Sequence, residues 1–137
     1  MGWRRFVPAD LGWYAGWFQD PELHRWLGPV ADVEWLTREP HEPVWVLDDA
    51  GTAVVLELTL DDGTHGFHGI IGLSVAPHRR RRGLGRRAVS DLLGGVLEVP
   101  PGAWVAFVEP ANTAARTLFR GIAASERMDA GMIRFDF

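Results

Sequence analysis

The chain has 137 residues, 47% of them hydrophobic, with 14 basic and 18 acidic side chains. This length predicts one domain, residues 1–137, with a buried core. The absence of cysteine excludes a disulfide framework, a thiolate zinc site and a cysteine nucleophile. No apolar run approaches the roughly 20 residues of a membrane helix, and no signal peptide is evident. We therefore expect a cytoplasmic protein with no membrane partner.

The charges are unevenly distributed along the chain. All 14 basic residues are arginine; residues 1–66 contain four of them and twelve acids, whereas residues 67–137 contain ten and six acids. Six of the arginines fall within Arg79–Arg87. This asymmetry indicates either an anionic and a cationic ligand on one domain, or an uneven surface charge without function.

Hydrophobic spacing, caps and turn residues divide the chain into short elements. Strands are predicted near residues 3–7, 44–47, 53–60, 66–75, 103–108 and 132–137. Helices are predicted near residues 11–18, 21–27, 32–38, 84–97 and 112–121. This order predicts a mixed α/β fold, a mixed sheet with helices on both faces.

One segment, residues 73–88, carries a recognisable chemistry. A strand end is followed by an arginine-rich loop and then by Gly83 and Gly85, which open a helix. Glycine lets the backbone approach a ligand, and a helix N-terminus presents unpaired N–H groups and a positive dipole. A phosphate or pyrophosphate is therefore the expected ligand. The arginines expected to add mobile positive charge are Arg80, Arg82, Arg86 and Arg87.

Three other interpretations of this segment stay open. An arginine run is often a solvated face or a nucleic-acid patch, although the net charge of −4 disfavours the latter. Gly83-x-Gly85-x-x-Ala88 also fits a dinucleotide-binding fingerprint, but several residues separate its first glycine from the strand. The third interpretation is a flexible loop without a ligand.

The loop contains the motif Arg80-x-x-Gly83-x-Gly85, between a strand that ends Val-x-Pro and an amphipathic helix. This arrangement resembles the acetyl-CoA signature of the GNAT acetyltransferase superfamily. Residues 108–112, Val-Glu-Pro-Ala-Asn, and the helix after them resemble the family's later segment. Residues 20–27 resemble the start of the aminoglycoside and ribosomal-protein N-acetyltransferase branches. The resemblance implies a mostly antiparallel sheet of six to seven strands, splayed between its two central strands. It also implies direct acetyl transfer from acetyl-CoA to an amine, without a metal.

The resemblance also implies roles for individual residues. Backbone groups of Leu73, Ser74 and Val75 would pair with the pantetheine arm, and the Val75 N–H would stabilise the oxyanion. Asn112 would hydrogen-bond near the pantetheine or the thioester, and Arg116 would approach a CoA phosphate. The residues that would form the pyrophosphate loop are Arg80, Arg81, Arg82, Gly83, Leu84, Gly85 and Arg86.

The sequence departs from the family where many members carry a tyrosine that protonates the leaving thiolate. That position is Phe119, which donates no proton. Either another group or water serves instead, or the protein is a CoA-binding module with little or no catalysis. The only tyrosine is Tyr14, expected on the substrate side.

The general base is predicted among carboxylates and histidines near the central strands. Glu109, at the end of the splayed strand, is the first candidate; Glu57 and His68 are weaker ones, and Ser74 would position a water. His65 and His68 have H-x-x-H spacing, but no third ligand is in view, so no metal is expected.

The acceptor side is predicted in the first, aromatic-rich third of the chain. Trp13, Tyr14 and Trp17 lie on one helix and would line a pocket or a dimer contact. The surrounding acids would attract a cationic amine to aromatic faces. A polyamine, an aminoglycoside and a peptide N-terminus all fit, and both a monomer and a homodimer are compatible with the sequence.

Overall fold

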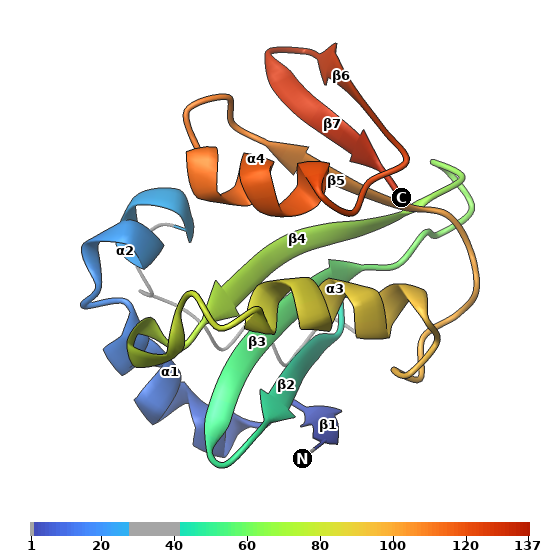
Figure 1. The fold of residues 1–137 in the computed structure, drawn as a ribbon. Coiled ribbons are helices and arrows are strands. Elements are labelled where there is room, and N and C mark those ends of the chain that lie inside the picture. Colours follow the sequence, from blue (N-terminus) through green and yellow to red (C-terminus); the bar gives the residue numbers. More distant parts are fainter. Residues whose placement is uncertain (1, 28–41) are drawn as a thin grey trace.

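The structure, a computed structural model, describes residues 2–27 and 42–137. Within these ranges seven strands form one sheet in the order β1-β2-β3-β4-β5-β7-β6 (Figure 1). The strands are β1 (Gly2–Arg5), β2 (Val44–Asp48), β3 (Thr52–Thr59), β4 (His68–Val75), β5 (Trp104–Val108), β6 (Ser125–Asp129) and β7 (Met132–Asp136). The α-helices are α1 (Leu11–Trp17), α2 (Pro21–Leu27), α3 (Leu84–Leu93) and α4 (Thr113–Arg120). The helix predicted at 32–38 lies outside the described residues.

The sheet is mostly antiparallel, as predicted. Every neighbouring pair of strands is antiparallel except β4 and β5, which run parallel. The parallel pairing is short: it joins residues 68–70 of β4 to residues 104–106 of β5. Beyond Ile70 the two strands have no paired residues, and their arrowheads separate in Figure 1. The predicted splay between two central strands is confirmed.

Alternating side chains on β2 and β3 show that helices cover both faces of the sheet. Val46 and Val55 pack with Tyr14 of α1. The intervening residues face the other way, where Val54 packs with Ala88 of α3. Because both faces are buried, these strands are continuous apolar runs rather than alternating ones. α4 shares the larger core with α3, through Phe119 and residues of β5 and β7.

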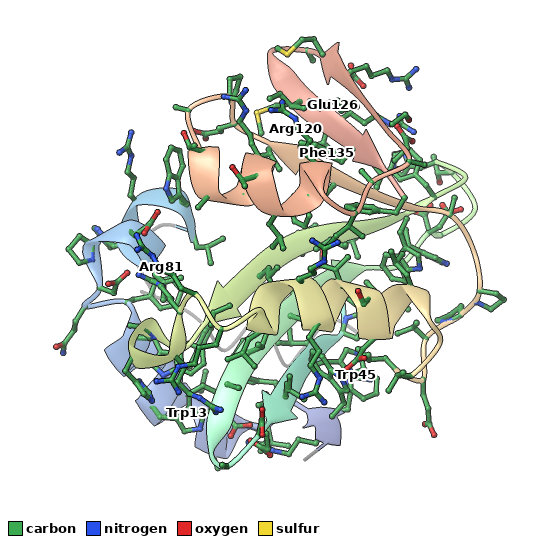
Figure 2. The ribbon with its side chains drawn as sticks, viewed as in Figure 1. Trp13, Trp45, Arg81, Arg120, Glu126 and Phe135 are labelled. Atoms are coloured by element: carbon green, nitrogen blue, oxygen red, sulfur yellow. The ribbon has the colours of Figure 1, made fainter. Side chains whose placement is uncertain are left out.

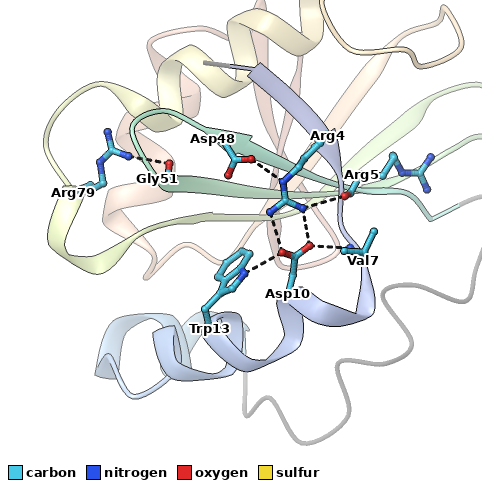
Figure 3. A network of polar contacts seen from close by, with 8 residues as sticks. All are labelled: Arg4, Arg5, Val7, Asp10, Trp13, Asp48, Gly51 and Arg79. Atoms are coloured by element: carbon cyan, nitrogen blue, oxygen red, sulfur yellow. Dashed lines mark hydrogen bonds and ion pairs between the residues drawn. The ribbon is translucent and has the colours of Figure 1, made fainter.

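A polar network fixes α1 to the first two strands (Figure 3). The Arg4 guanidinium donates to Asp10 at 2.8 and 2.9 Å and to Asp48 at 2.7 Å. Asp10 also accepts from the Val7 N–H and the Trp13 indole N–H. These hydrogen bonds lower the pKa of the buried Asp10, and the hydrogen bond from Arg4 has the largest effect. The start of α1 is thereby held in one position relative to the sheet.

The largest differences from the sequence prediction are the end of α3 and the strand β6. The helix predicted at 84–97 ends at Leu93, because Gly94 caps it and Gly95 takes a left-handed φ of 77°. Strand β6 was not predicted. All five of its residues are exposed, so it carries no hydrophobic alternation, and it is recognised only through its pairing with β7. Arg120 of α4 holds this edge strand through a two-point ion pair with Glu126 (Figure 2).

Candidate active site

A cavity of about 540 Å³ opens where β4 and β5 separate. One wall comes from α2, through Leu23, Trp26 and Leu27, and another from α4 and the residues that precede it. The floor is the splayed part of β4 and β5. The predicted site residues that line the cavity are Leu73, Val75, Arg80, Arg81, Glu109 and Asn112. The arrangement brings the strand end, the arginine loop and the Asn112 segment together, as the sequence analysis expected.

The side of β4 that faces β5 is available to a ligand. Within the described residues no strand pairs with this side after Ile70, whereas the opposite side stays paired with β3 up to Val75. Backbone N–H and C=O groups that face a cavity can bind an extended chain that contains amides, in the manner of an added strand. The pantetheine arm of CoA is such a chain, so the residues present fit this group.

The loop after β4 reaches the N-terminus of α3 through two left-handed residues. Arg81 and Gly83 both have left-handed φ angles, 61° and 74°, and Gly83 is the N-cap of α3. The N-terminus of α3 at this turn presents unpaired backbone N–H groups and the positive end of the helix dipole. A β-carbon on Gly83 would meet no other atom within 4 Å, so its backbone is openly accessible. The loop therefore fits a pyrophosphate.

Gly85 has a packing role that the sequence analysis did not distinguish from that of Gly83. A β-carbon there would lie 3.2 Å from Leu118 of α4 and 3.7 Å from Leu73 and Val75 of β4. A side chain at this position would have to displace the Leu118 side chain, so glycine favours the close approach of the first turn of α3 to α4. A bulky residue at Gly85 would thus disturb the core, whereas one at Gly83 would project into the open site.

The arginine cluster is less free than its sequence indicates. Arg80 contacts Asp20 at 2.7 Å and Glu22 at 3.7 Å, and Arg87 contacts Asp49 and Asp91. The expectation of mobile charge was therefore wrong for Arg80 and Arg87, because folding places beside them acids from the residue before α2, from α2 itself, from the β2–β3 turn and from α3. Arg81, labelled in Figure 2, and Arg82 make no ion pair within the described ranges. This pattern disfavours a nucleic-acid patch.

Asn112 and Arg116 stabilise the turn that begins α4. The Asn112 side chain accepts a hydrogen bond from the Ala115 N–H at 3.2 Å, as the N-cap of the helix. Arg116 donates to the Pro110 carbonyl, and its buried Nε has no partner within the described residues. Asn112 lines the cavity and Arg116 does not. Contact of either residue with CoA stays a prediction.

The predicted catalytic residues occupy different positions around β4. Glu109 is exposed at the rim of the cavity. Ser74 is fully buried on the α1 side of the sheet, where its hydroxyl shares a 3.2 Å hydrogen bond with Tyr14. The His68 ring lies within hydrogen-bonding distance of the Asp61 N–H and the Pro101 carbonyl, so both of its nitrogens already have partners. These roles stay predictions.

Phe119, the residue in the family's tyrosine position, lines the cavity and is 5% exposed. Its ring packs against Phe135 and Phe137, with centroids 5.7 and 5.6 Å away. This packing explains why phenylalanine rather than tyrosine occupies position 119, because the ring is surrounded mainly by apolar side chains. The proton for a leaving thiolate must then come from elsewhere.

The aromatic side chains of α1 are not in the cavity wall. Trp13, Tyr14 and Trp17 pack with one another and with Phe6 and Phe18, and Tyr14 is 1% exposed. Their contact with an acceptor stays a prediction. Trp26 of α2 was not among the predicted site residues, yet it does line the cavity. Its signal was present: Leu23, Trp26 and Leu27 recur at helical spacing and give α2 one apolar face.

Within residues 2–27 and 42–137 no three metal-ligating side chains gather at one place. The described helices include none with the length and apolar character required to cross a membrane.

We expect Asp20 to position Arg80 for an anion in the loop. The Asp20 carboxylate accepts from Arg80 and from the Leu23 N–H, and the Arg80 hydrogen bond is the main cause of its lowered pKa. Asp20→Asn should raise the dissociation constant of acetyl-CoA several-fold, because Arg80 loses its fixed orientation. Fluorescence titration with acetyl-CoA measures this change. An unchanged constant in the folded variant would show that Arg80 needs no such support.

Comparison with known proteins defines the class to which this fold and cavity belong. Residues 9–122 match the model of the Acetyltransferase (GNAT) family. The chain therefore belongs to the GNAT acetyltransferase family, a family of enzymes. No curated protein matches the chain.

Solved structures show the same fold at low sequence identity. An acetyltransferase from Thermus thermophilus has a TM-score of 0.79 and 19% identity, with 100% of this chain and 97% of that chain covered. Spermidine N-acetyltransferase from Vibrio cholerae, in complex with CoA and spermine, has a TM-score of 0.74 and 13% identity, with 98% and 91% covered. The ribosomal-protein-S18-alanine N-acetyltransferase from Escherichia coli has a TM-score of 0.66 and 14% identity, with 98% and 89% covered.

Proposed function

We propose that this protein transfers the acetyl group of acetyl-CoA to a primary amine of a small molecule or a peptide. The observation that carries the proposal is a juxtaposition: the unpaired edge of β4 is followed in the chain by a loop with left-handed residues at a helix N-terminus. An amide-containing arm fits the first part and a pyrophosphate fits the second. Membership of the GNAT family and the CoA bound to the Vibrio cholerae neighbour support this assignment.

The donor lies with its pantetheine arm along Leu73–Val75 and its pyrophosphate over Arg81–Arg86. Arg81 and Arg82 then supply positive charge, and Arg80 is held between the phosphates and α2. This placement brings the thioester to the middle of the splay. A β4 N–H that faces the cavity, for which Val75 is the first candidate, stabilises the negative charge on the carbonyl oxygen during transfer.

The acceptor approaches past α2 and the rim of the cavity. Glu22 and Glu109 line the cavity, so their carboxylates favour a cationic amine at its entrance. Trp26 presents an aromatic surface beside them. Two structural neighbours are named for acceptors of this class, a polyamine and a protein alanine. With Phe119 unable to donate a proton, water in the cavity protonates the thiolate.

A turnover assay with acetyl-CoA tests the proposed function. The purified protein is mixed with acetyl-CoA and with either spermidine or an alanine-initiated tetrapeptide, and the free thiol of CoA is measured. We expect thiol release that depends on the amine, together with one added acetyl group on that amine by mass spectrometry. If acetyl-CoA binds but neither amine accelerates thiol release, the assigned transfer to primary amines of this kind is contradicted.

A further inference from the structure

Glu57 is a buried acid beside the proposed thioester position. It lies on β3, pairs with Gly72 of β4 and is 8% exposed. Its side chain extends across Gly72, because a β-carbon built on Gly72 would lie 1.9 Å from Glu57 Oε2 and 2.8 Å from its carboxyl carbon. A residue with any side chain at position 72 would displace this carboxyl group. The glycine in the middle of β4 therefore has a specific purpose, since it makes room for Glu57.

The local geometry places this carboxyl group over Gly72, a residue of the cavity wall. The pairing register shifts between Glu57 and Leu58, whose partners are Gly72 and Ile70, so Ile71 is an extra residue in β4. Such β-bulges re-aim side chains and end pairing next to active sites. Here the bulge coincides with the point where β4 leaves β5, and Gly72 belongs to the cavity wall. The Glu57 carboxyl group thus lies over Gly72, where β4 begins to separate from β5.

No positive charge compensates Glu57 within the described residues. Glu57 takes part in none of the ion pairs of these residues. Its electrostatic interactions are with Glu42, which precedes β2, and with Tyr14 of α1. Burial, with a smaller contribution from Glu42, raises the pKa of Glu57 to about 7. A carboxyl group with this pKa exchanges a proton near neutral pH, which suits a proton acceptor. Among the described residues Glu57 has no counterion, and a buried acid of this kind favours a cationic ligand beside it.

We propose, building on the proposed function, that Glu57 is the catalytic base, which takes the proton of the acceptor ammonium across Gly72. The ammonium gives one proton to the Glu57 carboxylate and becomes a neutral amine. Its nitrogen forms a bond to the thioester carbonyl carbon, the carbon–sulfur bond breaks, and the thiolate takes up the second nitrogen proton through water. Glu57 then returns its proton to solvent. Glu109, which is exposed at the rim, attracts the amine instead.

The test is a double-mutant cycle of Glu57→Gln and Gly72→Ala, with spermidine and the alanine-initiated tetrapeptide as probe amines. We expect Glu57→Gln to lower kcat/KM on the order of 100-fold and to remove the limb near pH 7 from its pH profile. Gly72→Ala should cause much of the same loss, because its methyl group displaces the carboxyl. In the Glu57→Gln background, Gly72→Ala should add almost nothing. Glu98→Gln, the same change at an exposed position, is the matched control.

Acetyl-CoA affinity, measured on each variant, separates this inference from the proposed function. Unchanged affinity with lost turnover in Glu57→Gln supports the inference. Normal kcat/KM in Glu57→Gln, or additive losses in the double variant, overturns it while acetyl transfer stands. Failure of the wild-type protein to acetylate either probe, although acetyl-CoA binds, contradicts the proposed transfer and the inference together. Failure of the wild-type protein to bind acetyl-CoA refutes the proposed function itself.

Discussion

Replacement of Gly83 by valine is expected to lower the affinity for acetyl-CoA by about 100-fold or more, equivalent to about 3 kcal/mol. Gly83 has a φ of 74° and faces open space, at the point where the loop presents its N–H groups. A branched side chain there is strained, because L-residues avoid this conformation, and it blocks the close approach of a phosphate. Isothermal titration calorimetry with acetyl-CoA measures the loss.

Gly95→Val is the matched control for this experiment. Gly95 has a φ of 77°, also faces open space and lies beyond the opposite end of α3. The two variants should lose similar stability through backbone strain, of order 1–2 kcal/mol. Only Gly83→Val should lose the ligand. Equal affinities in the two variants would contradict the placement of the pyrophosphate.

The second large effect concerns the pH dependence of stability. Because the pKa of Glu57 is raised to about 7 in the folded protein, the folded state binds a proton more tightly than the unfolded chain does. The contribution of Glu57 to stability is therefore highest at acid pH. It declines as the pH rises from about 4.5 to about 7, by about 3 kcal/mol. Glu57→Gln lacks this titration, so its stability should change less over the same interval.

Urea unfolding at pH 5 and pH 8 measures this difference for wild type and Glu57→Gln. The wild type should lose more stability than the variant between the two pH values, so the variant gains relative to wild type at pH 8. The free energy of unfolding of each protein is compared between the two pH values. Any packing change caused by the glutamine is the same at both and therefore cancels. A parallel pH dependence in the two proteins would show that Glu57 titrates as it does in the unfolded chain.

The fold could be predicted from the sequence where the hydrophobic periodicity and the turn residues indicate the same elements. The strand–loop–helix segment at 73–88 and the Asn112 segment were recognisable because each is continuous in the chain, and residues of both line the cavity. Strand β6 escaped prediction since its residues are all exposed and only pairing with β7 defines it. The early end of α3 was marked by Gly94 and Gly95, but the apolar Val96 and Leu97 extended the periodic pattern beyond it.

The relations that connect distant segments were not predictable in the same way. Arg80 and Asp20 are 60 residues apart, and nothing in either segment indicates that they form an ion pair. Glu57 was only a weak candidate for the base because its importance depends on register: it pairs with Gly72 at a bulge. A glycine inside a predicted strand was the available signal, since it can mark a close approach, but Gly72 is one of three glycines in residues 66–75.

The central claim is that acetyl-CoA binds along β4 and over the loop before α3. Isothermal titration calorimetry of acetyl-CoA into the wild-type protein tests it most directly. We predict one binding site per chain with a dissociation constant on the order of 1–100 μM, in the range usual for enzyme substrates. Absence of binding at millimolar acetyl-CoA, in protein that is folded, would contradict the claim.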